Sequence, residues 1–363
     1  MTEATGTTPG GRGAGRPARL YRFNAAAGYV VGIDVGIHSV RALLANMAGD
    51  IIARVEETVV PGTVGQDRMK SVKRVIGQCL SKARVPKGDL LALGVAVSGL
   101  VGANGRLVVS RNFPDWEGAD IAGHLRAEFQ CIVVVDNDIR LAAFAEHKLG
   151  AAQLVDDVAY FFVGHRMSVG LIIGGKIRHG RHNAAGEIGD IAFSGWANEA
   201  GELAWTSAAT GEQVFKQASE GDSASQAEIA RFVEAIAPGV ATVVMAVDPD
   251  VVVIGGGLSR AGELLLQPLR KAVQNQIVVP VVPTIIGSDL GAESVVLGAA
   301  AQAFEQISAV LFGVEDIPAP ALNHRSLPPW QTVDAARKPV MTAIAATESP
   351  RNDSSPRGVA PVS

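Results

Sequence analysis

The chain has 363 residues, 48% of them hydrophobic and 19% charged, with a net charge of −4 at pH 7. This length suits two domains, and the small negative charge gives no general attraction to nucleic acid. Two cysteines, Cys79 and Cys131, exclude a disulfide framework and a Cys-rich zinc site. There is no apolar signal-like start and no uncharged apolar run of the ~20 residues that span a bilayer, so we expect a cytoplasmic protein without membrane contact.

Both ends of the chain have compositions typical of disorder. Residues 1–24 combine Gly, Thr, Pro and Ala with a basic segment, and residues 313–363 contain several prolines and few large apolar side chains. We expect both ends to be flexible. The folded part then divides into two domains, which we place at 25–138 and 139–312.

The first half begins with β-branched segments. Tyr29–Asp34, Val40–Met47 and Ile51–Val60 are separated by Gly36 and Gly49, which predicts consecutive strands joined by tight turns. The next predicted elements are a helix over 66–84, a strand at Leu91–Val97, a helix at Ala119–Phe129 and a strand at Ile132–Val135.

The second half repeats this order of strands followed by a helix. Strands are predicted at Val158–Val163 and Val169–Ile173, followed by a Gly174-Gly175 turn. A long helix spans Ala227–Val247, and Pro238 inside it should cause a kink or a break. The strand Val251–Ile254 then leads into Gly255, Gly256 and Gly257. Two similar halves predict an α/β fold with two domains around a central cleft.

Two acidic segments follow strands of the first half. Asp34 and Gly36 occupy a turn, where a carboxylate can hold a magnesium-bound water and a glycine admits a phosphate. Asn137 and Asp138 follow a buried strand, where Asp138 can act as a general base on a hydroxyl and Asn137 as a polar contact. The structural alternatives are an ordinary acidic turn for Asp34 and capping of the next helix for Asn137 and Asp138.

The second half contains two comparable segments. Ala185–Asp190 places the carboxylates of Glu187 and Asp190 three residues apart between glycines, a pattern that suits vicinal sugar hydroxyls or, alternatively, a solvated loop. The three glycines at 255–257 permit close approach of a ligand to a helix start, or simply tight packing of a turn.

In this order and spacing, the segments resemble the ROK family (repressors, open reading frames and kinases) over about residues 20–308. Further parts of the resemblance are Asn112–Trp116, Asp248-Pro249, and Leu290–Glu293 running into Leu297–Ala300. The resemblance implies two ribonuclease-H-like domains of the actin-like ATPase and sugar-kinase class, with the last helix packing back on the first domain. It implies a hexose or amino sugar in the cleft, with Asp138 as the base of an active kinase and Asn112, Asn137 and Glu187 on sugar hydroxyls.

The chain departs from the family pattern in both phosphate loops. Family kinases have Gly-Gly-Thr where this chain has Gly36-Ile37-His38, and the second loop reads Gly164-His165-Arg166 where a Thr and glycines are usual. Because phosphoryl transfer depends on positioning, bulky side chains there should prevent it. Arg166 can instead bind a phosphate already on the ligand. A degenerate nucleotide site would then comprise the following residues: Asp34, Gly36, His38, Gly164, His165, Arg166, Gly255, Gly256 and Gly257.

The zinc-binding residues of the family are also replaced. Asp190 stands where the family has a zinc-binding histidine that touches the sugar, and no cysteine occurs in Ser194–Thr210. We therefore predict that the protein binds no zinc, and that ATP with Mg²⁺ is a cofactor only if kinase activity is retained.

The basic segment Gly15–Phe23 resembles the link between the DNA-binding wing and the sugar domain of ROK repressors. So few residues precede it that a complete winged helix-turn-helix, of about 60 residues, does not fit. Either the DNA-binding part is lost or the true start lies upstream, unless the segment is a basic tail that matches by chance. DNA is a partner only if an upstream winged helix exists.

Three functions remain open from the sequence. The first is a sugar-sensing, repressor-like effector-binding protein with a degenerate kinase site, whose ligand is a sugar or sugar phosphate. The second is an active, glucokinase-like ROK enzyme that phosphorylates a hexose or N-acetylhexosamine. The third is a non-catalytic interaction or dimerisation module. For each of them a homo-dimer or homo-tetramer is expected.

Overall fold

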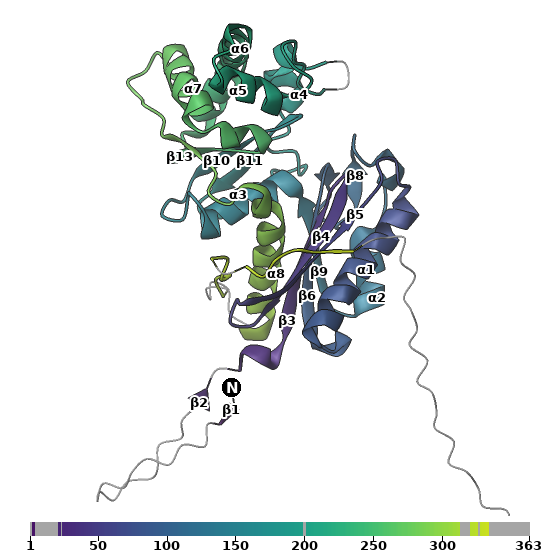
Figure 1. Ribbon diagram of the computed structural model, residues 1–363. Coiled ribbons are helices and arrows are strands. Elements are labelled where there is room, and N and C mark those ends of the chain that lie inside the picture. The colour runs from purple at the N-terminus through teal and green to yellow at the C-terminus, as the bar shows by residue number, and fades with distance from the viewer. Residues whose placement is uncertain are drawn as a thin grey trace, which may run out of the picture.

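The structure is a computed structural model that describes residues 2–3, 21–22, 24–198, 201–312, 320–325 and 327–333. Its described part contains two large β-sheets, one in each lobe of the molecule, with two helices between them (Figure 1). The six-stranded sheet belongs to residues 25–138 except for its edge strand, and the five-stranded sheet belongs to residues 139–312. This two-lobed α/β architecture agrees with the fold class that the sequence predicts.

The first lobe is a six-stranded sheet in the order β15-β5-β4-β3-β6-β9. The strands are β3 (Tyr29–Val35), β4 (Ser39–Asn46), β5 (Ile51–Thr58), β6 (Leu90–Val97), β9 (Ile132–Asn137) and β15 (Gln331–Val333). Strands β3, β4 and β5 form an antiparallel meander, whereas β6 and β9 continue the sheet in parallel to β3. Helices α1 (Gly65–Ala83) and α2 (Ile121–Phe129) pack on this sheet, and a small hairpin of β7 (Leu100–Val101) and β8 (Leu107–Val109) precedes α2.

The second lobe is a five-stranded sheet in the order β12-β11-β10-β13-β14. Its strands are β10 (Val158–Val163), β11 (Met167–Ile173), β12 (Lys176–Ile177), β13 (Val251–Gly255) and β14 (Ile285–Gly287). Helices α5 (Gly211–Ser219), α6 (Ser223–Val247) and α7 (Glu263–Gln276) cover its outer face, and the short α4 (Gly189–Ala192) lies beside them (Figure 1).

Two helices join the lobes. Helix α3 (Asp138–Leu149) begins directly after β9 and packs on β10 and β11, whereas α8 (Ser294–Phe312) packs back on β3 and β6 of the first lobe. Their mutual contact is close because a Cβ on Gly298 would lie 1.9 Å from the Leu141 carbonyl oxygen. A Cβ on Gly94 of β6 would lie 1.8 Å from the Ala299 carbonyl, so only glycine permits both approaches. One continuous apolar cluster therefore connects both sheets through α3 and α8.

The elements predicted from the sequence are present, with boundaries shifted by a few residues. One predicted feature differs, which is the effect of Pro238 on helix α6. Helix α6 runs unbroken through Pro238, so of the predicted kink or break the break does not occur. Pro238 and Glu234 both lie on the exposed side of the helix. The Glu234 carbonyl that loses its backbone donor can therefore face water, while Phe232, Ile236 and Val240 hold the opposite face in the core.

Helix α6 is also long and apolar enough to cross a membrane by composition alone. Over half of that apolar window is buried inside the second lobe, however. Its hydrophobicity is therefore accounted for by packing against the five-stranded sheet and the neighbouring helices.

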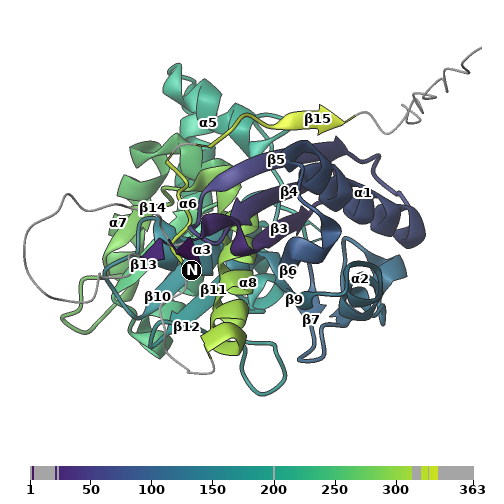
Figure 2. The same cartoon turned by 90° about the horizontal axis from the view of Figure 1, so that it is seen from below.

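The expected flexible tail at 313–363 is partly wrong. Strand β15 pairs in parallel with β5 at the edge of the six-stranded sheet, where it lies beside β5 in Figure 2. The Trp330 ring stacks on the Arg54 guanidinium at 3.9 Å and its Nε1 donates to Glu293 at 3.0 Å. Leu322 is buried against the core. Stacking, several hydrogen bonds and strand pairing therefore hold residues 320–325 and 327–333. The remainder of that tail lies outside the described residues.

Most of the predicted N-terminal tail, 1–24, also lies outside the described residues. The part that is described comprises Asn24 and two short strands, β1 (Thr2–Glu3) and β2 (Tyr21–Arg22), which pair antiparallel to each other.

Candidate functional site

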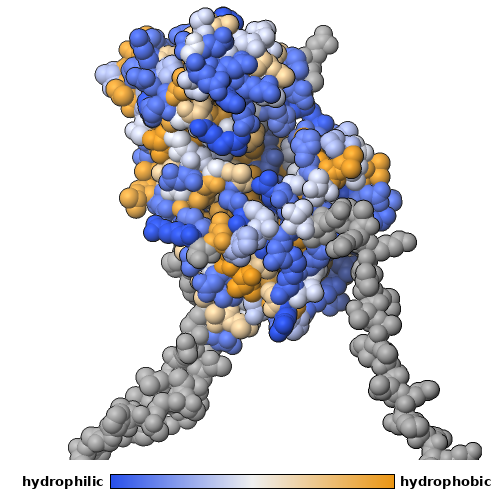
Figure 3. All heavy atoms as spheres, in the orientation of Figure 1, coloured by the Kyte–Doolittle hydropathy of each residue, from blue (hydrophilic) through white to orange (hydrophobic). Residues whose placement is uncertain are grey.

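A cavity of about 400 Å³ lies between the two lobes. The first lobe contributes segments that follow β6 and β9 and the end of β8, and the second lobe contributes the turn between β10 and β11 and the segments around α4. Lining residues include Ser98, Gly99, Arg111, Asn112 and Asn137 on one side and Arg166, Met167, Ser168, Glu187, Phe193 and Leu203 on the other. Figure 3 shows the surface hollowed between the two lobes. Three separated sequence predictions, Asn112, Asn137 and Glu187, therefore meet in one cavity.

The two asparagines are held by hydrogen bonds to the same strand-to-loop segment. Asn112 Nδ2 donates to Ser98 Oγ at 2.8 Å, and Asn137 Nδ2 donates to the Gly99 carbonyl at 3.0 Å. The Asn137 side-chain oxygen also accepts from the backbone N–H groups of Ile139 and Arg140, so it caps helix α3. The capping alternative for Asn137 thus applies, and one side-chain N–H remains for a ligand.

Asp138 opens helix α3 and is only partly exposed. One of its oxygens accepts from the Ile139 N–H at 2.9 Å. Burial, together with the negative charges of Asp34 and Glu187, raises the pKa of Asp138 to about 7. Asp138 is therefore poised between its protonated and ionised forms near neutral pH.

Asp34, at the end of β3, belongs to the same electrostatic group. Burial raises the pKa of Asp34 to about 6, against the opposing effect of Arg41. The charge of Asp34 contributes to the raised pKa of Asp138, so the two carboxyls interact electrostatically. Two partly buried carboxyls that interact in this way cannot both ionise without an electrostatic free-energy cost.

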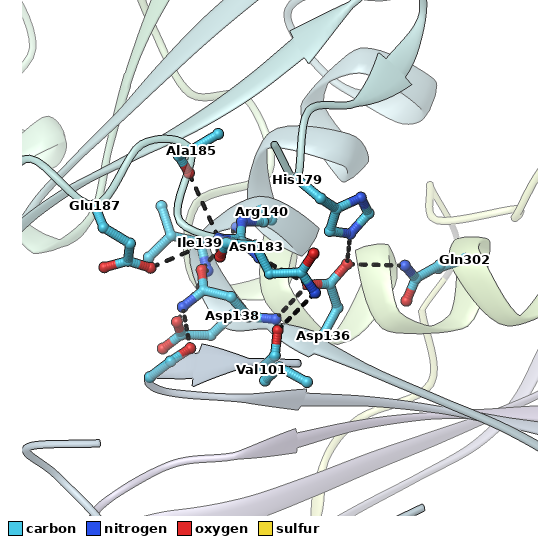
Figure 4. A network of polar contacts seen from close by, with 12 residues as sticks. Val101, Asp136, Asp138, Ile139, Arg140, His179, Asn183, Ala185, Glu187 and Gln302 are labelled. Carbon is cyan, nitrogen blue, oxygen red and sulfur yellow. Dashed lines mark hydrogen bonds and ion pairs between the residues drawn. The ribbon is translucent and has the colours of Figure 1, made fainter. Parts of the chain in front are cut away.

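A buried polar network next to the cavity joins the lobes (Figure 4). Arg140 of α3 is almost fully buried and donates to Asp136, to the Asn183 carbonyl and to the Ala185 carbonyl. Asp136 also contacts His179 Nε2 at 2.6 Å and Gln302 Nε2 at 3.1 Å. Despite its burial, the pKa of Asp136 is lowered by its hydrogen bond to His179. The carboxylate is thus ionised, and the network fixes the segment that carries Glu187.

The two predicted phosphate turns approach each other as well. In the first, Gly36 closes the hairpin from β3 to β4, and its carbonyl accepts from the buried Arg68 at 2.6 Å. In the second, Gly164 and His165 turn β10 into β11, and the His165 carbonyl accepts from Leu203 N–H at 2.7 Å. Removal from water lowers the pKa of His165, and Arg166 and His38 add to this effect, so His38 of the first turn lies in the electrostatic surroundings of the second.

Comparison with known proteins identifies the group to which this architecture belongs. The ROK family model matches residues 30–202 and 190–306. The chain belongs to the ROK family. This confirms the resemblance that the sequence motifs indicate.

The relatives of this ROK protein include both regulators and enzymes. It is 27% identical to a xylose repressor of Caldicellulosiruptor bescii, with 75% of each chain covered, and 26% identical to a glucokinase of Streptomyces coelicolor, with 75% of this chain and 96% of the glucokinase covered.

Solved structures show the same fold in both groups. A ROK glucokinase from Streptomyces griseus in complex with glucose and AMPPNP superposes with a TM-score of 0.64 at 23% identity, covering 76% of this chain and 99% of the kinase. A ROK transcriptional regulator homologous to the Escherichia coli MLC protein superposes with a TM-score of 0.67 at 19% identity, covering 78% and 80%. These likenesses establish the two-domain sugar-kinase fold.

The fit of ATP with Mg²⁺, which the family implies, is poor at the second turn. The Leu203 N–H donates to the His165 carbonyl, so the segment that contains Leu203 lies against this turn. Arg166 lines the cavity from the position where the family has a glycine. Asp34 and Asp138 are the residues that would hold a magnesium ion if a nucleotide were bound. Among the described residues no group of three or more His, Cys, Asp or Glu side chains is placed to hold a metal.

The residues that line the cavity do not include Asp34, His38, Asp138, His165 or the three glycines at 255–257. Gly255 ends β13, and Gly256, which follows it, has a φ of +83° and packs on the Val163 backbone. A Cβ on Gly255 would lie 2.0 Å from the Tyr160 hydroxyl, so tight packing accounts for that glycine. Asp190 belongs to α4, but its side chain lies outside the described residues, so its sugar contact remains a prediction.

Sequence reasoning missed several residues of the site. Ser98 follows the predicted strand Leu91–Val97 at its carboxyl end, which was the available signal for a ligand-facing residue. Phe193 and Leu203 form an apolar part of the wall. His179 and Gln302 carried no signal, because their shared partner Asp136 is distant from both in the sequence.

Proposed function

We propose that this ROK protein binds a sugar in the cavity between its lobes and acts as a repressor-like, sugar-sensing effector domain that does not phosphorylate its ligand. The proposal is carried by one observation: Asn112, Asn137 and Glu187 line one cavity beside Asp138, while the second turn directs Arg166 into the same cavity. The residues suited to bind sugar hydroxyls thus lie together, whereas the second phosphate turn carries His165 and Arg166 where family kinases have a Thr and a glycine.

Carboxylates and amides suit the recognition of sugar hydroxyls. Hydroxyls can donate to Glu187 and Asp138 and accept from the remaining N–H of the asparagines. Binding between two lobes joined by α3 and α8 would favour one relative orientation of the lobes over others. Such a change is the signal that an effector domain passes on.

The proposed setting is the cytoplasm, where the sugar or sugar phosphate is the small-molecule partner. We propose that the protein acts as a homo-dimer or homo-tetramer. DNA is a partner only if a winged helix precedes this sequence in the whole protein.

A second candidate function is favoured by the raised pKa of Asp138. A carboxyl with a pKa of about 7 is well matched to act as a general base on a sugar hydroxyl at neutral pH. This observation supports an active, glucokinase-like hexose or N-acetylhexosamine kinase that uses ATP and Mg²⁺. The composition of the second turn argues against it.

Calorimetric titration over a panel of pentoses, hexoses and N-acetylhexosamines, with their phosphates, tests the proposed function. At least one sugar should bind with a dissociation constant below a few millimolar, because two or three charge-assisted hydrogen bonds suffice for such affinity. If no member of the panel binds at millimolar concentrations, the sugar-sensor proposal is wrong and an interaction module becomes the better description.

A further inference from the structure

We infer that the sugar recognised by this cavity carries an anionic group, a phosphate or a carboxylate, and that Arg166 is the residue that selects it. This inference rests on the proposed function, since it names the class of sugar that the same cavity takes. Three features of Arg166 support it: its position, its unmet hydrogen-bonding capacity and its loose ion pair.

The position of Arg166 is set by backbone geometry. It lies in the tight turn from β10 to β11, where the Gly164 N–H donates to the Arg166 carbonyl at 3.1 Å. Its side chain lines the cavity together with Asn112, Asn137 and Glu187. A guanidinium held by a short turn in the wall that carries the hydroxyl-binding groups can reach a charged substituent of the same ligand.

The Arg166 side chain is under-bonded in the described part of the chain. It is 22% exposed, and its Nε–H is buried without a hydrogen-bond partner. A buried donor without a partner is costly, particularly on a charged group. Two oxygens of a carboxylate or phosphate group can accept from Nε–H and a terminal N–H together, which is the bidentate arrangement that guanidinium groups favour.

The ion partner of Arg166 is weakly held. Glu202 approaches Arg166 Nη2 at 4.0 Å, which is too long for a hydrogen bond, and the Glu202 side chain is 47% exposed. Since an exposed pair of this kind contributes little, a ligand anion can replace Glu202 at small cost.

The charged groups around Arg166 leave it as the cation that would contact an anionic group of the ligand. The pKa of His165 is lowered by its removal from water and by the Arg166 charge, so the imidazole is neutral at pH 7 and supplies no second cation. Glu187, the acidic group of this cavity wall, lies 3.8 Å from the buried Arg140 and its charge is thereby offset. Arg111 lines the opposite wall and has interactions of its own.

Calorimetry on four proteins tests the inference: wild type, Arg166→Gln, Glu202→Gln, and Arg231→Gln as a charge-matched control on the exposed surface of α6. The probes are glucose, glucose 6-phosphate, glucuronate, N-acetylglucosamine and its 6-phosphate, and inorganic phosphate. We expect an anionic sugar to bind at least tenfold more tightly than its neutral parent, with an affinity that falls as salt rises.

Arg166→Gln should remove that preference while leaving the affinity for the neutral parent within about threefold. Glu202→Gln should strengthen anion binding a few-fold, because the competing carboxylate is gone, and Arg231→Gln should change nothing. The phosphate and carboxylate arms decide which anion is selected. Equal binding of neutral and anionic sugars, or a preference that survives in Arg166→Gln, would overturn the inference yet leave the proposed function standing. Failure of every sugar to bind would overturn both.

Discussion

Asp138→Asn is expected to weaken sugar binding roughly tenfold to a hundredfold. One oxygen of Asp138 is used by the Ile139 N–H, and the other can accept from a sugar hydroxyl. Asparagine preserves the shape and the bond to Ile139, so what is lost is the charge-assisted part of the contact, which is worth roughly 1.5–3 kcal/mol.

The pH dependence gives this prediction a second readout. Since the pKa of Asp138 is about 7, the carboxylate that accepts hydroxyl protons predominates at pH 8 and is a minority at pH 6. Affinity in wild type should therefore fall roughly tenfold from pH 8 to pH 6, whereas in Asp138→Asn it should stay flat over that range.

The free energy of unfolding should depend on pH in the opposite sense to sugar affinity, and should fall as pH rises. Because folding raises the pKa of Asp138 from 3.8 to about 7, the folded state holds an extra proton between these values, and the stability this provides is lost as pH rises through 7. Asp138→Asn should therefore unfold at higher urea than wild type at pH 8, by about 1–2 kcal/mol after allowing for solvent in the cleft, with no gain at pH 4.

Asp222→Asn is the matched control, since Asp222 caps α6 through Ser225 far from the cavity. It should leave sugar affinity unchanged. A sugar that binds wild type and Asp138→Asn equally at both pH values would show that Asp138 is not part of the binding site.

Arg140→Met should destabilise the protein by about 3–5 kcal/mol, the range seen when one partner of a buried ion pair is removed. Arg140 is 1% exposed and bonds to Asp136 and to the Asn183 and Ala185 carbonyls. Methionine fills similar space but leaves the ionised Asp136 with fewer partners and two carbonyls without their donor. Urea unfolding at pH 7, with the slope compared between variants, measures the change.

A double variant separates charge from packing. Asp136→Asn combined with Arg140→Met removes both charges, so its cost should be clearly smaller than the sum of the two single changes. Arg231→Met, on the exposed face of α6, should stay within about 0.5 kcal/mol of wild type. Strict additivity of the two buried changes would mean that the network does not act as a unit.

The framework of the fold could be predicted from the sequence because its signals are local. Alternating and β-branched runs fall on β3, β4, β5, β10 and β11, and helix-spaced apolar residues fall on α1 and α6. Turn glycines such as Gly174 and Gly175, both with positive φ, separate the strands. Family motifs added the order of the two lobes and the convergence of Asn112, Asn137 and Glu187.

What could not be predicted depends on contacts between distant segments. Arg140 is an isolated charge within a helix until Asp136, Asn183 and Ala185 surround it. Trp330 lies in a proline-containing stretch of low complexity, and its order comes from Arg54 and Glu293, which are remote in sequence. Continuity of α6 depends on which side of the helix Pro238 faces.

The central claim is that this ROK protein binds a sugar without phosphorylating it. It is tested most directly by measuring ADP release from ATP and Mg²⁺ in the presence of a saturating sugar that calorimetry has shown to bind. We predict that the sugar leaves the rate at its background value, because His165 and Arg166 occupy the turn that would position the phosphates. Sugar-dependent ADP release at ordinary kinase rates of about 1–100 s⁻¹, abolished by Asp138→Asn, would contradict the account and establish an active sugar kinase.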